Sequence, residues 1–491
     1  MPVMAINNSD ALGLYISIPF CRSKCTYCNF ASGVYPASEH TRYVERLIED
    51  LRSAAGSVTR MGVTLPRRVD TVYLGGGTPS LLAPELLARL FAAMRAEFDL
   101  GPDAEITVEC APGQIADETL DALVRAGVNR VSLGVQSFID REAATSGRLH
   151  TRAAVEEDLR RLRAAGIANL NLDLIAGLAG QTFASWDESL AALIGSGVPH
   201  ASVYMLEVDE DSRLGREMLA HGARYHAGLV PTDDAIAQMY SVAIDRLAAA
   251  GLRQYEISNF CRPGFASRHN LRYWQRRPYL GLGLDASSML RAAQTTEAAE
   301  IPGFVTGHAF SRAVSAAGSE RALQAAEKLC PGSVMCQGTT LVVPQADENG
   351  RRALAPAESS LDISPAIPSS SSTANQDSYV LRTTTTDDLT AYLAGPAPAE
   401  TAWLSPDRQH EEAWFLGLRL NAGIDVPALE QEFGPEQVAR AMETVKRLAA
   451  DGLLTSDGNP VRLTAQGQLL SNDVFQEFLD TVAEESVETP A

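Results

Sequence analysis

Short apolar runs alternate with longer amphipathic segments from residue 12 to about residue 260. Runs rich in β-branched residues predict six strands, over residues 14–18, 71–74, 105–109, 130–135, 170–175 and 202–206. The segments between them, such as residues 84–98 and 153–166, place apolar residues three and four positions apart and carry charge on the opposite face. This alternation predicts an α/β fold in which βα units form an open or partial (β/α)6 barrel.

The pattern changes twice after the predicted barrel. Residues 292–376 are rich in Ser, Pro and Ala with little periodicity, and we expect a largely flexible insertion there. Regular spacing then returns in an amphipathic helix over residues 409–420 and in the segments 428–434, 438–454 and 461–479. These segments predict helices followed by a short strand pair, at residues 451–458 and 460–467. We therefore interpret residues 1–291 as the barrel core and residues 377–491 as a small winged-helix-like α+β domain.

Charge and composition narrow the class of protein. The 491 residues include 41 Lys and Arg against 61 Asp and Glu, a formal net charge of −20 that repels nucleic acid and anionic lipid. No run approaches the roughly 20 apolar residues that span a bilayer, and the first residues do not read as a signal peptide. Seven cysteines, three of them close together, favour a reducing cytoplasm over secretion. We expect a cytoplasmic protein with no nucleic-acid partner and no membrane span.

Chemically useful residues follow several predicted strands at their carboxyl ends. Cys21 follows the first strand, a run of three glycines begins at Gly75 after the second, and Glu109 and Gln136 end the third and fourth. Parallel (β/α) folds gather their functional residues at this edge of the sheet. The sequence therefore predicts one site there.

Three cysteines form a C-x3-C-x2-C loop directly after the first predicted strand, at Cys21, Cys25 and Cys28. Three thiolates on one short loop can bind three irons of a [4Fe-4S] cubane and leave the fourth iron open to another ligand. The alternatives are a zinc site or unconnected buried thiols. Structural zinc takes four ligands in paired spacings, and no second Cys pair follows the loop. The cluster is the favoured interpretation, with Cys110, Cys261, Cys330 and Cys336 as spare thiols.

The loop resembles that of the radical S-adenosylmethionine (SAM) superfamily, and its surroundings extend the resemblance. The segments YLGGGTPS, ITVECAP, GVQSF, SGRLHT and LNLDLIAG match, in order, motifs of the coproporphyrinogen dehydrogenase-like branch. The resemblance implies that SAM chelates the open iron and that an electron donor reduces the cluster. Electron transfer from the cluster then cleaves SAM and gives a 5′-deoxyadenosyl radical. It also implies a set of SAM contacts, with Phe30 beside the cluster loop: Tyr15, Gly76, Gly77, Thr78, Glu109, Gln136, Arg148 and Asp173. Taken singly, each of these also fits a structural role, and the three-glycine turn fits a simple tight loop.

Within this branch the chain resembles the HemW-type heme chaperones. The dehydrogenase has a further cysteine where this chain has Phe30, and it has a longer N-terminal extension than the 13 residues before the first predicted strand. The segment HNLRYW matches the HNxxYW motif of HemW-type proteins at His269, Tyr273 and Trp274. The resemblance implies binding of heme near this motif and its delivery to heme-acceptor proteins.

Two further functions stay open from the sequence. One is an enzyme, the oxygen-independent coproporphyrinogen III dehydrogenase, and the other is a degenerate scaffold that binds no SAM. The HNxxYW residues can also be read as a turn-capping His269 with Tyr273 and Trp274 in the core. The chain departs from the family pattern at Ser17, where the usual residue is His, and at Asp285 and Ser287 in a glycine-rich segment.

Overall fold

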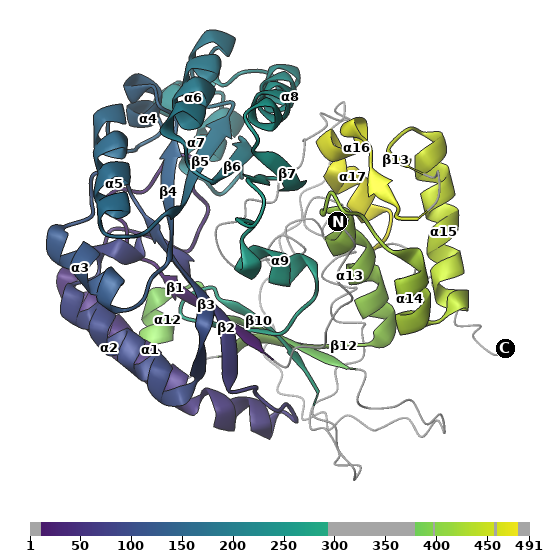
Figure 1. Cartoon of the computed structure of the whole chain (residues 1–491), viewed down its shortest axis with the longest axis horizontal. Helices are drawn as coiled ribbons and strands as arrows, with labels where there is room; N and C mark the ends of the chain where they lie inside the picture. The colour runs from purple at the N-terminus through teal and green to yellow at the C-terminus, as the bar shows by residue number, and fades with distance from the viewer. Residues whose placement is uncertain (1–10, 293–378, 396–397, 456–458, 480–491) are drawn as a thin grey trace, which may run out of the picture.

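The computed structural model describes residues 11–292, 379–395, 398–455 and 459–479. Six neighbouring parallel strands form the centre of a larger sheet, and all six strand predictions are confirmed (Figure 1). They are β1 (Leu12–Ile18), β2 (Arg68–Gly76), β3 (Asp99–Cys110), β4 (Arg130–Gln136), β5 (Asn169–Ala176) and β6 (His200–Met205). The sheet order is open at both ends, so the strands form the partial barrel that the sequence predicts.

Helices cover the outer face of these strands (Figure 1). They are α1 (Ala37–Arg60), α2 (Pro84–Glu97), α3 (Asp117–Arg125), α4 (Asp140–Thr145), α5 (Arg152–Ala164), α6 (Phe183–Ser196) and, beyond β6, α8 (Asp233–Ala249). Local sequence explains where α6 begins and ends. Thr182 caps its N-terminus in a capping box with Ser185, and Gly197 ends the helix in a left-handed conformation. The helices bury one apolar face against the strands, where Leu12, Leu14 and their neighbours form the main core.

The opposite face of the strands is polar at alternate positions. Asn171 Nδ2 donates to the hydroxyls of Ser132 (2.7 Å) and Ser202 (3.0 Å), which lie on the strands to either side. The Asn171 carboxamide oxygen lies 2.6 Å from His200 Nδ1, and Ser202 donates to Asn259 (2.9 Å). These side chains satisfy one another inside the barrel, so the interior holds a hydrogen-bonded network rather than an apolar core.

The sheet continues beyond the six predicted strands to twelve in the described chain. On one side it adds β8 (Asn259–Cys261) and β7 (Arg253–Glu256), and on the other β9 (Tyr279–Leu282), β10 (Ser287–Arg291), β11 (Val380–Thr385) and β12 (Pro398–Leu404). Strand β9 pairs parallel with β1, whereas β10, β11 and β12 run antiparallel. Strand β10 precedes the predicted insertion and β11 follows it, so the segments that flank the insertion pair in one sheet. The insertion itself lies outside the described residues, apart from Ala292, and the division into domains stays a prediction.

A second apolar core lies under the C-terminal helices. It is built by α13 (Pro406–Leu418), α14 (Val426–Phe433), α15 (Pro435–Ala450), α17 (Ser471–Gln476) and the pair β13 (Leu454–Thr455) and β14 (Arg462–Leu463). The rings of Trp414 and Phe478 stack at its centre, with centroids 5.1 Å apart. Helix α16 (Ala465–Leu469) contacts α17 and β14 beside this core. The predicted helices and strand pair are present. Helix α9 (Arg268–Trp274) of the barrel contributes Tyr273 and Trp274 to the same core.

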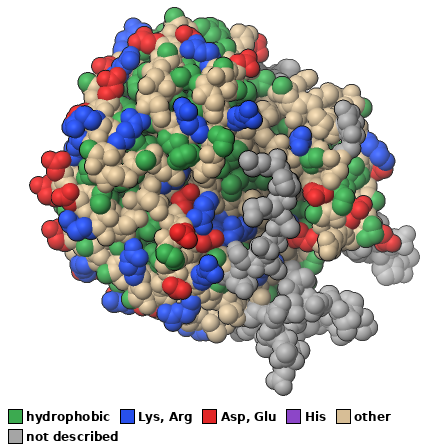
Figure 2. Space-filling view, viewed as in Figure 1, with side chains coloured by type: hydrophobic (Ala, Val, Ile, Leu, Met, Phe, Trp, Pro, Cys, Tyr) green, Lys and Arg blue, Asp and Glu red, His purple; other side chains and the backbone are tan. Residues whose placement is uncertain are grey.

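The surface carries charges of both signs. Figure 2 shows Lys and Arg side chains among Asp and Glu side chains over one face, with apolar side chains between them. Within the residues that the structure describes, no helix is long and apolar enough to cross a membrane.

Candidate functional site

The three cysteines of the loop after β1 lie beside the α4–α5 connection. Thr26 N donates to Ser146 O (3.0 Å), which fixes the loop against this connection. At Gly147 (φ +91°) a Cβ atom would lie 3.2 Å from Cys25 Cα, so a side chain here would crowd the loop and strain the backbone. Cys25 is buried, whereas Cys21 and Cys28 are half-buried. The loop is therefore folded onto the barrel edge, with all three thiols free of disulfide bonds.

The loop surroundings suit thiolate ligands of a cluster. Burial raises the pKa of the Cys28 thiol to about 11, and burial also raises the pKa of Cys21. Ionising these thiols thus requires nearby positive charge, which bound irons would supply. Hydroxyl groups lie near two of the sulfurs: Thr78 Oγ1 is 4.0 Å from Cys21 Sγ, and Ser32 Oγ is 3.9 Å from Cys28 Sγ. No three His, Cys, Asp or Glu side chains in the described ranges converge on a single-ion site, whereas a cubane places each thiolate on a different iron.

The glycine run at the end of β2 packs against the cysteine loop. Gly77 N donates to Ile18 O (2.8 Å) and Thr78 N donates to Phe20 O (2.7 Å). A Cβ atom at Gly77 would lie 2.8 Å from each of these two carbonyl oxygens, and Gly76 has a φ of +96°. The contact between the two loops therefore explains Gly77, and the positive φ explains Gly76, without a ligand. Their predicted contact with SAM stays a prediction.

Tyr15 and Glu109 lie on the polar face of the barrel beside this turn, together with Tyr73, which sequence reasoning missed. Tyr73 donates to Glu109 Oε1 (2.8 Å), and the rings of Tyr15 and Tyr73 lie 6.2 Å apart. Burial raises the pKa of Tyr15 well above its usual value, and the Glu109 carboxylate raises it further. The alternation of β2 puts Tyr73 on the same face as Gly75, and this signal could have identified it.

Gln136 and Arg148 meet beside Gly134 of β4. Arg148 Nη1 donates to Cys25 Sγ (3.5 Å), and its Nη2 donates to Gly134 O. A Cβ atom at Gly134 would lie 2.7 Å from the guanidinium and 3.2 Å from Gln136 Nε2. Gln136 has a φ of +68°, and its Oε1 is buried without a hydrogen-bond partner in the described chain. Such an acceptor in a strained conformation fits a ligand that donates a hydrogen bond, as the hydroxyls and amino group of SAM do.

Asp173 lies one strand further along the same edge. Its carboxylate accepts from Ser132 Oγ (3.1 Å) and from Asn171 Nδ2 (2.7 Å). Burial raises the pKa of Asp173, and hydrogen bonds from Ser202, Ser132 and Asn171 oppose the shift. The carboxylate thus already belongs to the internal network. Phe30 lies half-buried at the end of the cysteine loop, where its carbonyl accepts from Lys24 Nζ (3.0 Å).

The HNxxYW residues are buried: Tyr273 and Trp274 lie in the core shared with the C-terminal helices, and the His269 ring stacks on Tyr73, with centroids 5.3 Å apart. His269 is 1% exposed, and its ring nitrogens contact Thr71 Oγ1 (2.9 Å) and Tyr273 Oη (2.7 Å). Burial lowers the pKa of His269 well below its usual value, as do Arg272 and Arg130. Binding of iron by this imidazole would require one of its two hydrogen bonds to break.

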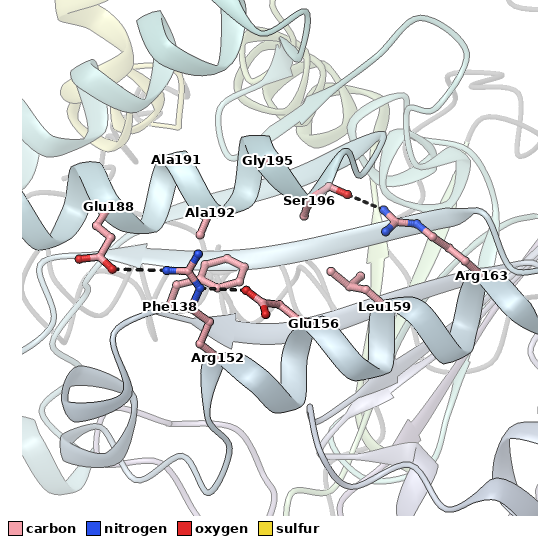
Figure 3. Close-up of a pocket in the computed structure, with 10 residues that line it drawn as sticks. All are labelled: Phe138, Arg152, Glu156, Leu159, Arg163, Glu188, Ala191, Ala192, Gly195 and Ser196. Atoms are coloured by element: carbon pink, nitrogen blue, oxygen red, sulfur yellow. Dashed lines mark hydrogen bonds and ion pairs between the residues drawn. The ribbon is translucent and has the colours of Figure 1, made fainter.

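A groove of about 510 Å³ lies between α5 and α6 on the outer surface (Figure 3). Arg152 crosses it and pairs with Glu156 on α5 (2.9 Å) and Glu188 on α6 (3.3 Å). Arg163 donates across the same groove to Ser196 O (2.7 Å). These contacts join neighbouring helices, and no predicted site residue lines the groove.

Comparison with known proteins agrees with this geometry. The sequence matches the Radical SAM superfamily over residues 15–193 and the HemN C-terminal domain over residues 404–470. The structure of coproporphyrinogen III oxidase (HemN) from Escherichia coli aligns with a TM-score of 0.67 over 95% of this chain and 90% of that chain. At 20% identity this likeness establishes the fold alone.

The curated relatives are closer in sequence. The heme chaperone HemW of Lactococcus lactis is 36% identical over 56% of this chain and 69% of that protein, and that of Escherichia coli is 34% identical over 60% and 76%. The HemW of Bacillus subtilis is 27% identical over 95% of this chain and 98% of that protein. A partial barrel with three cysteines after its first strand, and the superfamily match, define a radical SAM protein, a class that implies a [4Fe-4S] cluster and SAM. Within this class, the chain belongs to the HemW family.

Proposed function

We propose that this protein is a cytoplasmic heme chaperone that carries a [4Fe-4S] cluster, binds SAM and heme, and delivers heme to acceptor proteins. The observation that carries the proposal is its similarity to several proteins named heme chaperone HemW, one of which, from Bacillus subtilis, aligns over 95% of this chain. The Phe30 position and the HNLRYW segment support the same assignment.

Cys21, Cys25 and Cys28 are the proposed iron ligands. The arrangement supports this role because the loop is anchored on two sides, by the glycine run at Gly77 and by the α4–α5 connection at Ser146. Arg148 provides a positive charge and a hydrogen-bond donor at the Cys25 sulfur. When bound, the cluster and SAM supply one-electron chemistry, for which an electron-donor protein is an expected partner.

The proposed SAM contacts are the strand-end residues described above. Gln136 offers a buried acceptor, and Glu109 offers a carboxylate held by Tyr73. Tyr15 gives an aromatic surface beside Glu109. Asp173 has the least structural support among the proposed SAM contacts, because its two carboxylate oxygens already accept hydrogen bonds from Ser132 and Asn171.

Anaerobic reconstitution followed by heme titration tests the proposal. We expect about one heme per chain, a spectral change of the cluster on addition of SAM, and transfer of heme to an apo-acceptor protein. The matched control is the triple variant with Ser at positions 21, 25 and 28, which should fold but retain no cluster. Reconstituted protein that takes up no stoichiometric heme would contradict the proposal.

The same preparation separates the two alternatives. Conversion of coproporphyrinogen in the presence of SAM and a reductant would identify an enzyme instead of a chaperone. A normal cluster spectrum that SAM leaves unchanged would identify a scaffold without a SAM site.

A further inference from the structure

The turn between β9 and β10 packs against the end of β1, just before the cysteine loop. At Gly283 a Cβ atom would lie 2.5 Å from Ser17 O. The backbone N of Leu284 donates to Tyr43 Oη (2.7 Å), and Tyr43 in turn donates to Ser17 O (2.7 Å). Because β9 runs parallel to β1, this turn lies at the same edge of the sheet as the cysteine loop and the glycine run.

Asp285 lies in this turn, beside the predicted SAM contact Tyr15. The next residue, Ala286, packs with Tyr15 and Tyr73 in a small buried cluster. The Tyr15 hydroxyl in turn reaches the glycine run, since a Cβ atom at Gly76 would lie 3.5 Å from it. The turn that carries Asp285 therefore adjoins two residues of the expected SAM site.

Asp285 adds a second carboxylate beside Tyr15. Glu109 lies on β3 and Asp285 between β9 and β10, so the two carboxylates come from opposite sides of β1 in the sheet order. Burial raises the pKa of Tyr15 most, followed by the negative charges of Glu109 and Asp285. Both acidic residues are half-buried rather than sealed in the core. Two accessible carboxylates at one site favour a cationic ligand over a neutral one.

The backbone at Asp285 is one that glycine adopts more easily. Its φ is +52°, in the left-handed region. Asp285 N donates to Thr386 O (2.9 Å) and Ala286 N donates to Thr385 Oγ1 (2.8 Å), so the end of β11 holds the turn in place. Other residues such as Arg276 also have a positive φ, and it is the contacts of the turn that place Asp285 at the site. Glycine would relieve the strain, so the backbone alone does not explain a carboxylate here.

We propose that Asp285 is a further residue of the SAM site, whose carboxylate, together with that of Glu109, stabilises the sulfonium charge of SAM. This inference rests on the proposed function and adds a specificity-determining residue to its SAM site. S-adenosylhomocysteine has a neutral sulfur where SAM has the sulfonium. The second carboxylate therefore favours SAM over adenosyl compounds that lack this charge.

Calorimetric titration of SAM and of S-adenosylhomocysteine into anaerobically reconstituted protein tests this inference. Asn has the shape of Asp and tolerates a left-handed backbone, so Asp285→Asn removes the charge and keeps the turn. We expect its affinity for SAM to fall about tenfold, the scale of one interaction with a charged group, and its affinity for S-adenosylhomocysteine to change by less than about threefold. The matched control is Asp121→Asn, which removes an exposed carboxylate from α3 and should bind both compounds as wild type does.

A second variant, Asp285→Gly, separates binding from folding. Glycine adopts a φ of this sign without strain, so the melting temperature should be no lower than that of wild type. The affinity for SAM should nevertheless fall about tenfold, as in Asp285→Asn. Wild-type affinity for SAM in Asp285→Gly would overturn the inference.

The outcomes separate this inference from the function on which it rests. If wild type binds no SAM, the proposed function fails and the inference fails with it. If wild type binds SAM and Asp285→Asn binds it equally well, the SAM site stands and the inference is wrong. An equal loss of affinity for SAM and for S-adenosylhomocysteine, with a lower melting temperature, would show a structural role and would also overturn it.

Discussion

Arg148 connects two parts of the candidate site through a single guanidinium. One nitrogen donates to Cys25 Sγ and the other to the Gly134 carbonyl at the end of β4. Burial of the side chain disfavours its charge, but the nearby thiol of Cys25 and the hydroxyl of Tyr27 hold the pKa of Arg148 above its usual value. A fixed positive charge beside a sulfur ligand stabilises the more negative, reduced form of a cluster.

Arg148→Gln should therefore lower the reduction potential of the bound cluster. The expected fall is about 60 mV, which for a one-electron couple equals about 1.4 kcal/mol, close to the contribution of one hydrogen bond to a charged group. Spectroelectrochemical titration of the reconstituted protein measures this potential. The control Arg152→Gln removes an arginine from the outer groove and should leave the potential unchanged. An unchanged potential in Arg148→Gln would mean that the guanidinium does not act on the cluster.

His410 should make the C-terminal core sensitive to acid. Trp414 Nε1 donates to His410 Nε2 (2.9 Å), so this nitrogen must be unprotonated, and burial lowers the pKa of His410 to about 4. The unfolded chain binds the proton at about pH 6.5, so it holds more protons than the folded chain between the two values. Stability should fall as the pH is lowered from about 6.5 toward about 4. In His410→Gln, melting temperatures measured across this window should depend less steeply on pH, whereas an equal slope would exclude His410 as a cause.

At the scale of elements, the glycine run illustrates how two loops determine one site. Gly77 lies where the backbone after β2 meets the backbone after β1, and its missing side chain permits the contact. Replacing it requires one of the two loops to move, and the loop that moves either carries the cysteines or packs against the loop that carries them.

Gly77→Ala should therefore weaken cluster retention more than it weakens the fold. A Cβ atom would lie 2.8 Å from two backbone oxygens, and overpacking of this kind costs about 1–3 kcal/mol. Iron content per chain after reconstitution and the free energy of unfolding in urea measure the two effects. The control Gly195→Ala adds a methyl group to α6, where nothing lies within 4 Å. Full iron content in Gly77→Ala would show that the close contact is unnecessary.

The sequence predicts those elements whose pattern is local. The six parallel strands and the helices between them follow from apolar spacing, and the cysteine loop follows from residue type. Strands β7 to β10 are three to five residues long, and their pairing depends on distant partners such as β1 and β11, which no local pattern reveals. The same limit applies to the site. Tyr73 approaches Glu109, and helix α7 (Arg213–Leu219) approaches the cysteine loop, only through tertiary structure.

At the scale of the whole molecule, the C-terminal helices are joined to the barrel by more than chain connectivity. Arg419, directly after α13, lies 3.8 Å from Glu256 of β7, and both side chains are buried. The Arg419 guanidinium also lies 4.3 Å from the centroid of the Trp274 ring. Backbone hydrogen bonds run beside this pair, from Ile257 N to Arg419 O (3.2 Å) and from Asn421 N to Tyr255 O (3.0 Å). The barrel and the C-terminal helices therefore share a desolvated ion pair at their junction.

Arg419→Gln should destabilise the junction and separate the unfolding of the two parts. Removing one partner leaves Glu256 buried without its countercharge, which typically costs about 3–5 kcal/mol. Burial already raises the pKa of Glu256, and Arg419 is the main group that opposes this shift. In calorimetry we expect one cooperative transition for wild type and two transitions for the variant. In the double variant with Glu256→Gln, much of the lost stability should return, because no uncompensated charge remains. A double variant no more stable than Arg419→Gln would instead attribute the loss to the contact between Arg419 and Trp274.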